Sequence, residues 1–377
     1  ASYNVSALAS MYRELGMSAQ KKLGNIEGTL NMQIPDGMRI PQAPLSRSEL
    51  IGGIGNALRY LRNQWRYLRD MPAYLADNPG WCQAMQARIL EATEGSELVF
   101  LWEQDIKHRS READLRVLLT ANHSSAYTMP LWRELVERVG PDDANALLSN
   151  LSDGSQSLDC LGPVVGVALV AYGQQSRQEY LQLWGHRGAH EFELSLPRPA
   201  EDPTWLDQQL EQYKASPVDV GAMLQAQRAG YQAAWERLQE SCLRQAPGLG
   251  RRIEESARRA RLREAARSEL ARVCWLMRHF ALQAAELTGL GQAVFFLRLD
   301  ELLDLLSGKG SQAVHYLPDR QAMYERYKAL PPYPSIISGR FDPFEWAADP
   351  VLRNNLYDAH TSVQAEPVEE SKTIKGS

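Results

Sequence analysis

The sequence predicts a mostly α-helical protein with long amphipathic helices and at most a few short strands. Almost no segment alternates apolar and polar residues over the length of a strand, and apolar residues recur instead at helical spacing. Apolar residues make up 44% of the 377 residues and charged residues 23%, which is typical of a globular protein with a packed core. The longest helical pattern runs from about 251 to 287 and stops at Gly289.

The shorter helices follow from caps and breakers along the chain. Residues 1–44 are irregular, Ser46 or Ser48 suits the N-cap of the first helix, and Pro72 ends it. Further helices are expected over about 80–108, 111–139, 142–152, 156–184, 203–215, 300–306 and 318–329. A proline-rich extended segment follows at 331–334. Only residues 190–196 alternate in polarity, and they predict a short extended segment.

The composition argues against two classes of binding partner, nucleic acids and membranes. The net charge of −5 argues against broad nucleic-acid binding, which needs a concentrated basic surface. The most apolar stretch, 161–173, is too short to cross a bilayer, so no membrane partner is expected. The four cysteines show no C-x-x-C spacing and are typical of reduced core residues in a cytoplasmic protein.

We expect one helical domain over residues 1–360, in which a subdivision near 195–205 is possible. The last residues, 361–377, lack aromatic side chains and are rich in Glu, Ser and Thr, so they read as a linker. Because the chain starts at an alanine and stops soon after the linker begins, we expect it to be an excised part of a longer protein.

The long helix carries two arginines, Arg263 and Arg267, one turn apart within its apolar stripe. That stripe consists of Ala260, Leu270, Val273, Cys274, Met277 and Ala281. A buried guanidinium without a partner costs several kcal/mol, so each arginine needs a carboxylate or a bound anion. Pairing with an acidic residue on a neighbouring helix, or snorkelling to the surface, satisfies this need, and so does a phosphate held in a cavity. The opposite side of the helix, with Glu269 and His279, is predicted to face solvent.

A second candidate segment places His186 and Arg187 between two glycines and close to Glu191 and Glu193. Glycine lets the backbone approach a ligand closely, and the guanidinium fork suits a carboxylate or a phosphate. The alternative is a satisfied loop in which Arg187 pairs with Glu191 or Glu193. His186 and His190 have the spacing of metal ligands, but Gly188 weakens a helical geometry between them, so no metal site is predicted.

Four groups of residues then point to one family. They are 185–188 with 197–198 and 201–203, next 262–269, then 295–297 with 300–302, and last 324–327 with 331–334. In this order they resemble the middle domain of phosphoenolpyruvate-synthase-like, PEP-utilising enzymes. The chain is similar to rifampin phosphotransferases and prodigiosin-forming condensing enzymes, most densely from Trp184 to Tyr357.

The resemblance implies a division of labour between three domains. In that family an ATP-grasp domain cleaves ATP, a swivelling domain carries a phosphohistidine, and a helical middle domain holds the acceptor. This chain is similar only to the middle domain, since it has neither the Gly-rich nucleotide loop nor a histidine in the carrier's Thr/Gly-rich setting. No cofactor is therefore expected in this chain. ATP and Mg would belong to the absent nucleotide domain, and the partners would be the other two domains and a small-molecule acceptor.

The resemblance also implies roles for individual residues. An Arg-Glu-x-x-(Lys/Arg) segment of the family's middle domain faces the phosphohistidine when the carrier docks. By motif match, Arg263 and Arg267 would neutralise the phosphoryl group in transit, and Glu264 would orient them. Acceptor binding is assigned to His186, Arg187 and Glu191.

Three functions remain open at this stage. The first is the acceptor-substrate domain of an ATP-dependent phosphotransferase of the dikinase type. The second uses the same relay to activate an acceptor for condensation, as in a biosynthetic ligase. The third is a non-catalytic helical interaction module whose arginines are paired internally. A cavity for an apolar acceptor would be lined by some of the plentiful tryptophans and tyrosines, but the sequence does not single them out.

Overall fold

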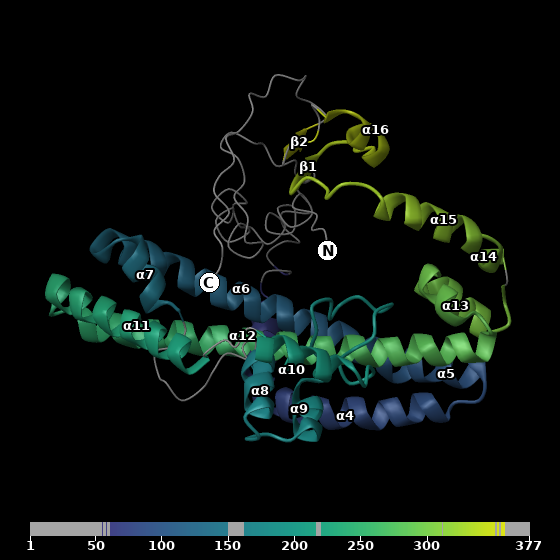
Figure 1. Ribbon diagram of the computed structural model, residues 1–377, viewed down its shortest axis with the longest axis horizontal. Helices are drawn as coiled ribbons and strands as arrows, with labels where there is room; N and C mark the ends of the chain where they lie inside the picture. Colours follow the sequence, from purple (N-terminus) through teal and green to yellow (C-terminus); the bar gives the residue numbers. More distant parts are fainter. Residues whose placement is uncertain are drawn as a thin grey trace. The chain divides into compact units, whose positions relative to one another are not determined.

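The computed structural model describes residues 55, 58, 61–149, 162–215, 220–310, 312–350, 353 and 356–358. The fold is mostly α-helical, as the sequence predicts (Figure 1). The described chain divides into two compact units. The first runs to Phe295 and includes Leu302–Lys309, and the second comprises Phe296–Glu301 and the residues from Gly310 onward.

The helices of the first unit follow one another with short connections. They are α4 (Met71–Glu91), α5 (Gly95–Leu101), a π-helical turn at Trp102–Ile106, α6 (Lys107–Val139), α7 (Pro141–Leu147), α8 (Gly162–Ala171), α9 (Arg177–Trp184), α10 (Trp205–Ala215), α11 (Val220–Cys242) and α12 (Ala246–Thr288). Residues 61–69 are also helical, and that helix ends just before Pro72, which lies in the first turn of α4. The helix end predicted at Pro72 is therefore confirmed, as is the stop of α12 at Gly289, whose φ is +69°.

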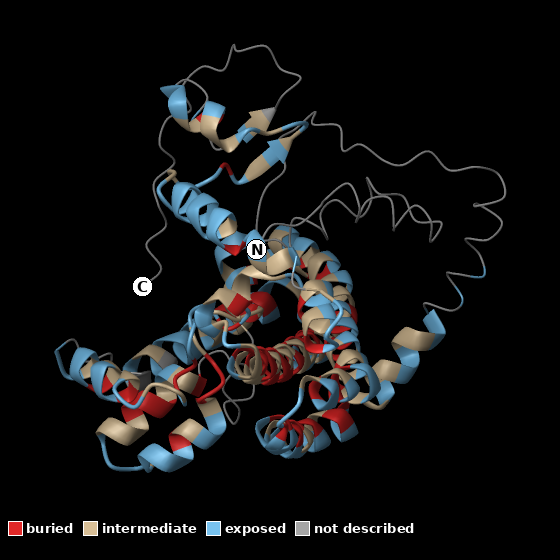
Figure 2. Cartoon of the chain, turned by 90° about the vertical axis from the view of Figure 1, so that its right-hand side faces the viewer, coloured by how far each residue is buried: buried red, intermediate tan, exposed pale blue. Residues whose placement is uncertain are grey.

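The centre of this unit is α12, which packs along α6 and α4 (Figure 1). Buried residues gather where these helices meet, as Figure 2 shows. The prediction that Glu269 and His279 face solvent is wrong. Glu269 is buried and accepts a hydrogen bond from Asn78 Nδ2 of α4 at 2.8 Å. The pattern misled because neighbouring helices cover that side of α12 too and supply polar partners for its charged residues.

A second core lies between α6, α7, α11 and the start of α12. Its buried members are Leu131, Leu135, Ala144, Leu147, Ala234, Leu238, Leu249 and Ile253. At the solvent-exposed edge of this core, Arg237 Nε of α11 donates a hydrogen bond to Asp143 of α7 at 2.6 Å. This core keeps α11 against α6 and α7.

A third, smaller core joins α8, α9 and α10. Its buried members are Val167, Tyr180, Leu206 and Leu210. A single helix over 156–184 was predicted, but two helices form, since Gly173 adopts a φ of +70° after α8 and the Ser176 side chain caps α9. Gly166 allows the close approach of α9, because a Cβ there would lie 2.8 Å from the Tyr180 ring.

The segment between α9 and α10 consists of turns, so the extended segment predicted over 190–196 is wrong. In the fold, burial is the reverse of what side-chain polarity suggests, because the charged Glu191 is buried and the apolar Phe192 is exposed. The side chain of Arg198 organises these turns. Its Nη1 donates to the carbonyls of Glu193 and Leu196, at 3.0 and 3.1 Å, and its Nη2 to that of Glu191 at 2.8 Å. Backbone carbonyls that a strand would pair with another strand are thus used by a buried guanidinium.

The second unit is smaller. It contains α15 (Leu317–Lys328), α16 (Pro343–Ala348) and two parallel strands, β1 (Ile336–Ser338) and β2 (Leu356–Asp358), in which Ile336 lies opposite Leu356. Unit boundaries fall within the 3-10 turn Gly291–Phe296 and within α13 (Leu299–Leu306), whereas α14 (Gln312–His315) belongs to the second unit. Aromatic rings of Tyr333, Phe341, Trp346 and Tyr357 pack on one another beside the strands.

Within the described residues, no helix combines the length and the hydropathy needed to cross a bilayer. The caps expected at Ser46 or Ser48, the irregular residues 1–44 and the linker 361–377 lie outside the described residues. A subdivision near 195–205 stays a prediction.

Candidate functional site

One turn of α12 carries the three residues for which the sequence predicts a catalytic role. Glu264 is buried, and its Oε1 accepts hydrogen bonds from Arg263 Nε at 3.1 Å and Nη2 at 2.9 Å. Arg267 Nη1 lies 3.9 Å from the other oxygen of the same carboxylate. The side chains of Arg263 and Arg267 are 41% and 44% exposed, so they do not lie within the buried stripe as predicted. Long side chains rooted in an apolar surface extend their charged ends outward in this way.

The segment after α9 supplies a second carboxylate to the same arginines. Arg187 Nε donates to Glu191 Oε2 at 2.6 Å, and both side chains are more than nine-tenths buried. Oε1 of Glu191 forms an ion pair with Arg267 Nη2 at 2.9 Å. The pairing of Arg187 with Glu191 that the sequence left open is therefore present. Glu191 in addition joins the α9–α10 segment to α12.

His186 anchors the same segment to α12 by a different contact. Its Nε2 lies 3.0 Å from Ser268 Oγ, and the imidazole is 1% exposed. Burial, together with the nearby charges of Arg272 and Arg187, lowers the pKa of His186 to about 2. The imidazole is therefore neutral at neutral pH and holds the hydroxyl next to Arg267 in the chain.

An ion pair between Arg278 of α12 and Glu201, a residue of the 201–203 motif, completes the attachment. Arg278 of α12 donates from Nε to Glu201 Oε2 at 2.8 Å and from Nη1 to the Leu194 carbonyl at 2.7 Å. Glu201 Oε2 also accepts the backbone N–H of Arg198 at 2.8 Å. The sequence signal for this attachment was the motif at 197–198 and 201–203, which contains Arg198 and Glu201 and holds the segment against α12.

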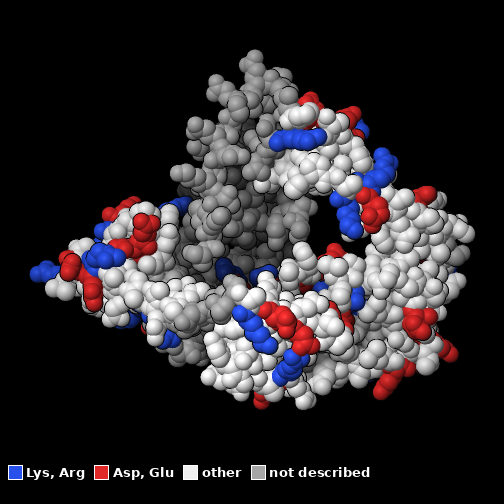
Figure 3. Space-filling view, viewed as in Figure 1, with Lys and Arg blue, Asp and Glu red and all other residues white. Residues whose placement is uncertain are grey.

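Five of the six predicted residues thus form one connected network. From the α9–α10 segment to α12, the order is Arg187, Glu191, Arg267, Glu264 and Arg263. Three guanidinium groups share two carboxylates, so the network carries one positive charge more than it can neutralise. On the face seen in Figure 3, Lys and Arg side chains lie in small groups together with Asp and Glu side chains. The excess in the network is what an added anion would balance.

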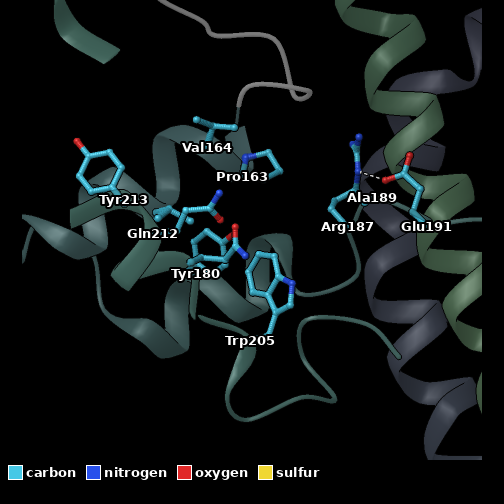
Figure 4. Close-up of a pocket in the computed structure, with 12 residues that line it drawn as sticks. Pro163, Val164, Tyr180, Arg187, Ala189, Glu191, Trp205, Gln212 and Tyr213 are labelled. Atoms are coloured by element: carbon cyan, nitrogen blue, oxygen red, sulfur yellow. Dashed lines mark hydrogen bonds and ion pairs between the residues drawn. The ribbon is translucent and has the colours of Figure 1, made fainter. Parts of the chain in front are cut away.

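A cavity of about 610 Å³ adjoins this network on the side of Arg187. It is lined by Pro163, Val164, Val167, Tyr180, Arg187, Gly188, Ala189, Glu191, Trp205, Gln209, Gln212 and Tyr213. Figure 4 shows Arg187 and Glu191 on one side and Val164, Trp205 and Tyr213 on the other. Tyr180, Trp205 and Tyr213 are the cavity-lining aromatic residues that the sequence could not single out. His186 does not line the cavity, unlike the other two residues assigned to acceptor binding.

One of the two histidines considered as a metal site, His186, contacts a hydroxyl instead, and Glu191 is held by two guanidinium groups. No group of three or more His, Cys, Asp and Glu side chains suited to a metal ion occurs among the residues the structure describes. Cys82 and Cys274 are free and buried, and burial raises the pKa of each to about 12.

A known protein family matches the part of the chain that contains this site. Residues 101–272 match the family model of the rifampicin phosphotransferase fourth domain. The chain contains a rifampicin phosphotransferase-like domain. The match includes the Arg187–Arg263 network and every residue that lines the cavity. The matched domain is a phosphotransferase-type enzyme domain, which agrees with the resemblance seen in the sequence. No curated protein matches the chain.

Proposed function

We propose that this chain is the acceptor-substrate domain of an ATP-dependent phosphotransferase. In this proposal, a phosphohistidine on a separate swivelling domain delivers its phosphoryl group to a small-molecule acceptor held by this chain. The observation that carries the proposal is the network in which three guanidinium groups share two carboxylates. The family match supports the class of reaction.

Arg263 and Arg267 are the groups we assign to the phosphoryl group. Both are close to half exposed, so a docking domain can reach their guanidinium groups, whereas Arg187 is buried. A phosphoryl group in transfer needs charge stabilisation and positioning more than covalent help from the protein. The incoming negative charge would compete with Glu264 and Glu191 for the two arginines.

Glu264 acts as a positioning residue in this account. Its buried carboxylate fixes Arg263 by two hydrogen bonds and lies close to Arg267. Glu191 plays the same part for Arg267 and Arg187. Because both carboxylates are themselves held in place, the guanidinium groups are oriented before any phosphoryl group arrives. His186 supports this arrangement through its contact with the Ser268 hydroxyl, and it does not touch the acceptor.

The test uses the full-length enzyme, which joins this chain to its ATP-grasp and phosphohistidine domains. ATP labelled in its β- and γ-phosphates is supplied, with rifampicin as the acceptor probe. We expect Arg263→Ala to leave labelling of the carrier histidine intact and to slow transfer to the acceptor at least about 100-fold. Arg258→Ala is the control, since Arg258 lies on the same helix, is exposed and pairs with Glu255.

Retained transfer in Arg263→Ala would contradict the role of the arginines and leave their pairing as a structural feature of a helical interaction module. Mass spectrometry of the product separates the two relay reactions. A stable phosphoester corresponds to the phosphotransferase, and a product coupled to a second molecule corresponds to the condensing enzyme.

A further inference from the structure

The cavity beside Arg187 has one wall that suits a flat apolar ring. Trp205 of α10 and Tyr180 of α9 stack on each other with ring centroids 6.3 Å apart. Val164 and Val167 of α8 continue this wall. Tyr180 is 1% exposed and belongs to the core that joins the three helices, so the wall is held rigidly. A volume of about 610 Å³ lies within the range typical of small-molecule sites.

Arg187, on the opposite side of the cavity, has a buried donor without an acceptor. Arg187 uses Nε for its hydrogen bond to Glu191, whereas its buried Nη1 has no hydrogen-bond partner among the described residues. Buried polar groups in proteins nearly always have partners, so such a donor marks a place where an acceptor belongs. Gln209 and Gln212 of α10 also line the cavity and add amide groups to it, and Gln212 lies beside Tyr213 on the side away from Arg187 (Figure 4).

The charges next to the cavity determine which kind of ligand it can bind. Glu191 is the acidic side chain in the lining, and it is already engaged by Arg187 and Arg267. The positive charge that remains favours a ligand with a single negative charge. A cation would be repelled by Arg187, and a neutral ring would leave its Nη1 without an acceptor.

We propose that this cavity binds an aromatic carboxylate, with the ring against Trp205 and Val164 and the carboxylate on Nη1 of Arg187. None of Arg263, Glu264 and Arg267 lines the cavity. The proposal rests on the proposed function only in that Arg187 shares Glu191 with Arg267. It is tested by binding alone, without ATP and without a transfer reaction.

The probes are biphenyl-4-carboxylate and its neutral counterpart biphenyl-4-carboxamide, titrated calorimetrically into the full chain. We expect the carboxylate to bind at least about ten-fold more tightly than the amide, as a charge-assisted hydrogen bond to a buried guanidinium predicts. Equal affinities would overturn the assignment of Arg187 as the anchor. Absence of heat with both probes would overturn the site.

Two tryptophan variants test the location. Val164→Trp places a large ring in the cavity from a half-exposed position on α8 and is expected to abolish binding. Leu183→Trp is the matched control, because Leu183 is an exposed residue of α9 that does not line the cavity. Unchanged binding by Val164→Trp would overturn the proposal. Circular dichroism confirms that both variants fold.

Arg187→Gln tests the anchor itself and is expected to make the carboxylate and the amide bind equally. Arg263→Ala is expected to bind the carboxylate as the unmodified chain does, since Arg263 lies outside the lining. A loss of phosphoryl transfer and a loss of carboxylate binding are thereby separate outcomes. Binding that disappears in Arg263→Ala would contradict the assignment of Arg187 as the anchor.

Discussion

Glu191 is the residue that connects the two halves of the candidate site. One carboxylate oxygen binds Arg187 within the α9–α10 segment, and the other pairs with Arg267 on α12. The sequence could suggest that Arg187 pairs with Glu191, because the two residues are four apart. It could not show the link to Arg267, since the residues lie far apart in the chain and meet only through the fold.

Removing the charge of Glu191 should therefore destabilise the protein. In Glu191→Gln, Arg187 remains buried without a full counter-charge, and the free energy of unfolding should fall by about 3 kcal/mol. Denaturant unfolding measures this change. Asp207→Asn is the control, because its ion pair with Arg177 is exposed on both sides and should contribute little. Similar losses in the two variants would argue against a buried network.

The pKa of His186 predicts a dependence of stability on pH. The unfolded chain protonates this residue below about pH 6.5, whereas the folded protein resists protonation until about pH 2. Stability is therefore complete above pH 6.5 and is lost as the pH falls below it. The contribution from His186 between pH 7 and pH 5 is roughly 2 kcal/mol.

His123 and His279 also have a lowered pKa because of burial, so the measurement compares the unmodified chain with His186→Gln. Free energies of unfolding at pH 5 and pH 7 should differ less in the variant. An identical pH dependence in the two proteins would show that the imidazole is accessible to protons.

At the scale of elements, the contact between α8 and α9 shapes one wall of the cavity. Gly166 of α8 faces the buried ring of Tyr180 so closely that a methyl group has no room. Gly166→Ala should lower the free energy of unfolding by about 1–3 kcal/mol, because the ring is held by its own core. Thermal and denaturant unfolding both report this loss.

Gly230 of α11 provides the matched control, since it is exposed and a Cβ there meets nothing within 4 Å. Gly230→Ala should stabilise the protein by about 0.5–1 kcal/mol, because alanine is the better helix former. A destabilisation by Gly230→Ala equal to that of Gly166→Ala would contradict the packing argument.

The helices themselves were largely predictable from periodicity, caps and breakers. Gly289 and Pro72 mark helix ends in the sequence and in the fold. Solvent exposure was less predictable, because α12 is covered on more than one side and its polar residues find partners there. The turns at 190–196 alternate in polarity without forming a strand, since Arg198 takes up their carbonyls. No helix was predicted between 216 and 250, where α11 lies.

At the scale of the whole molecule, motif order was more informative than composition. The family match over residues 101–272 agrees with the resemblance seen in the sequence, and all six predicted site residues lie within it. The structure brings Arg187, Glu191, Glu264, Arg263 and Arg267 together in one network. The cavity could not be predicted, because its lining comes from α8, α9, α10 and the turns between them.

The central claim is that Arg263 and Arg267 bind the phosphoryl group during its transfer. Crystals of the chain soaked in tungstate, a heavy analogue of phosphate, test this claim by anomalous scattering. We predict a peak in contact with both guanidinium groups, and its absence in crystals of the Arg263→Ala/Arg267→Ala variant. Crystals without a peak at that position, in which both arginines still pair only with Glu264 and Glu191, would contradict the account.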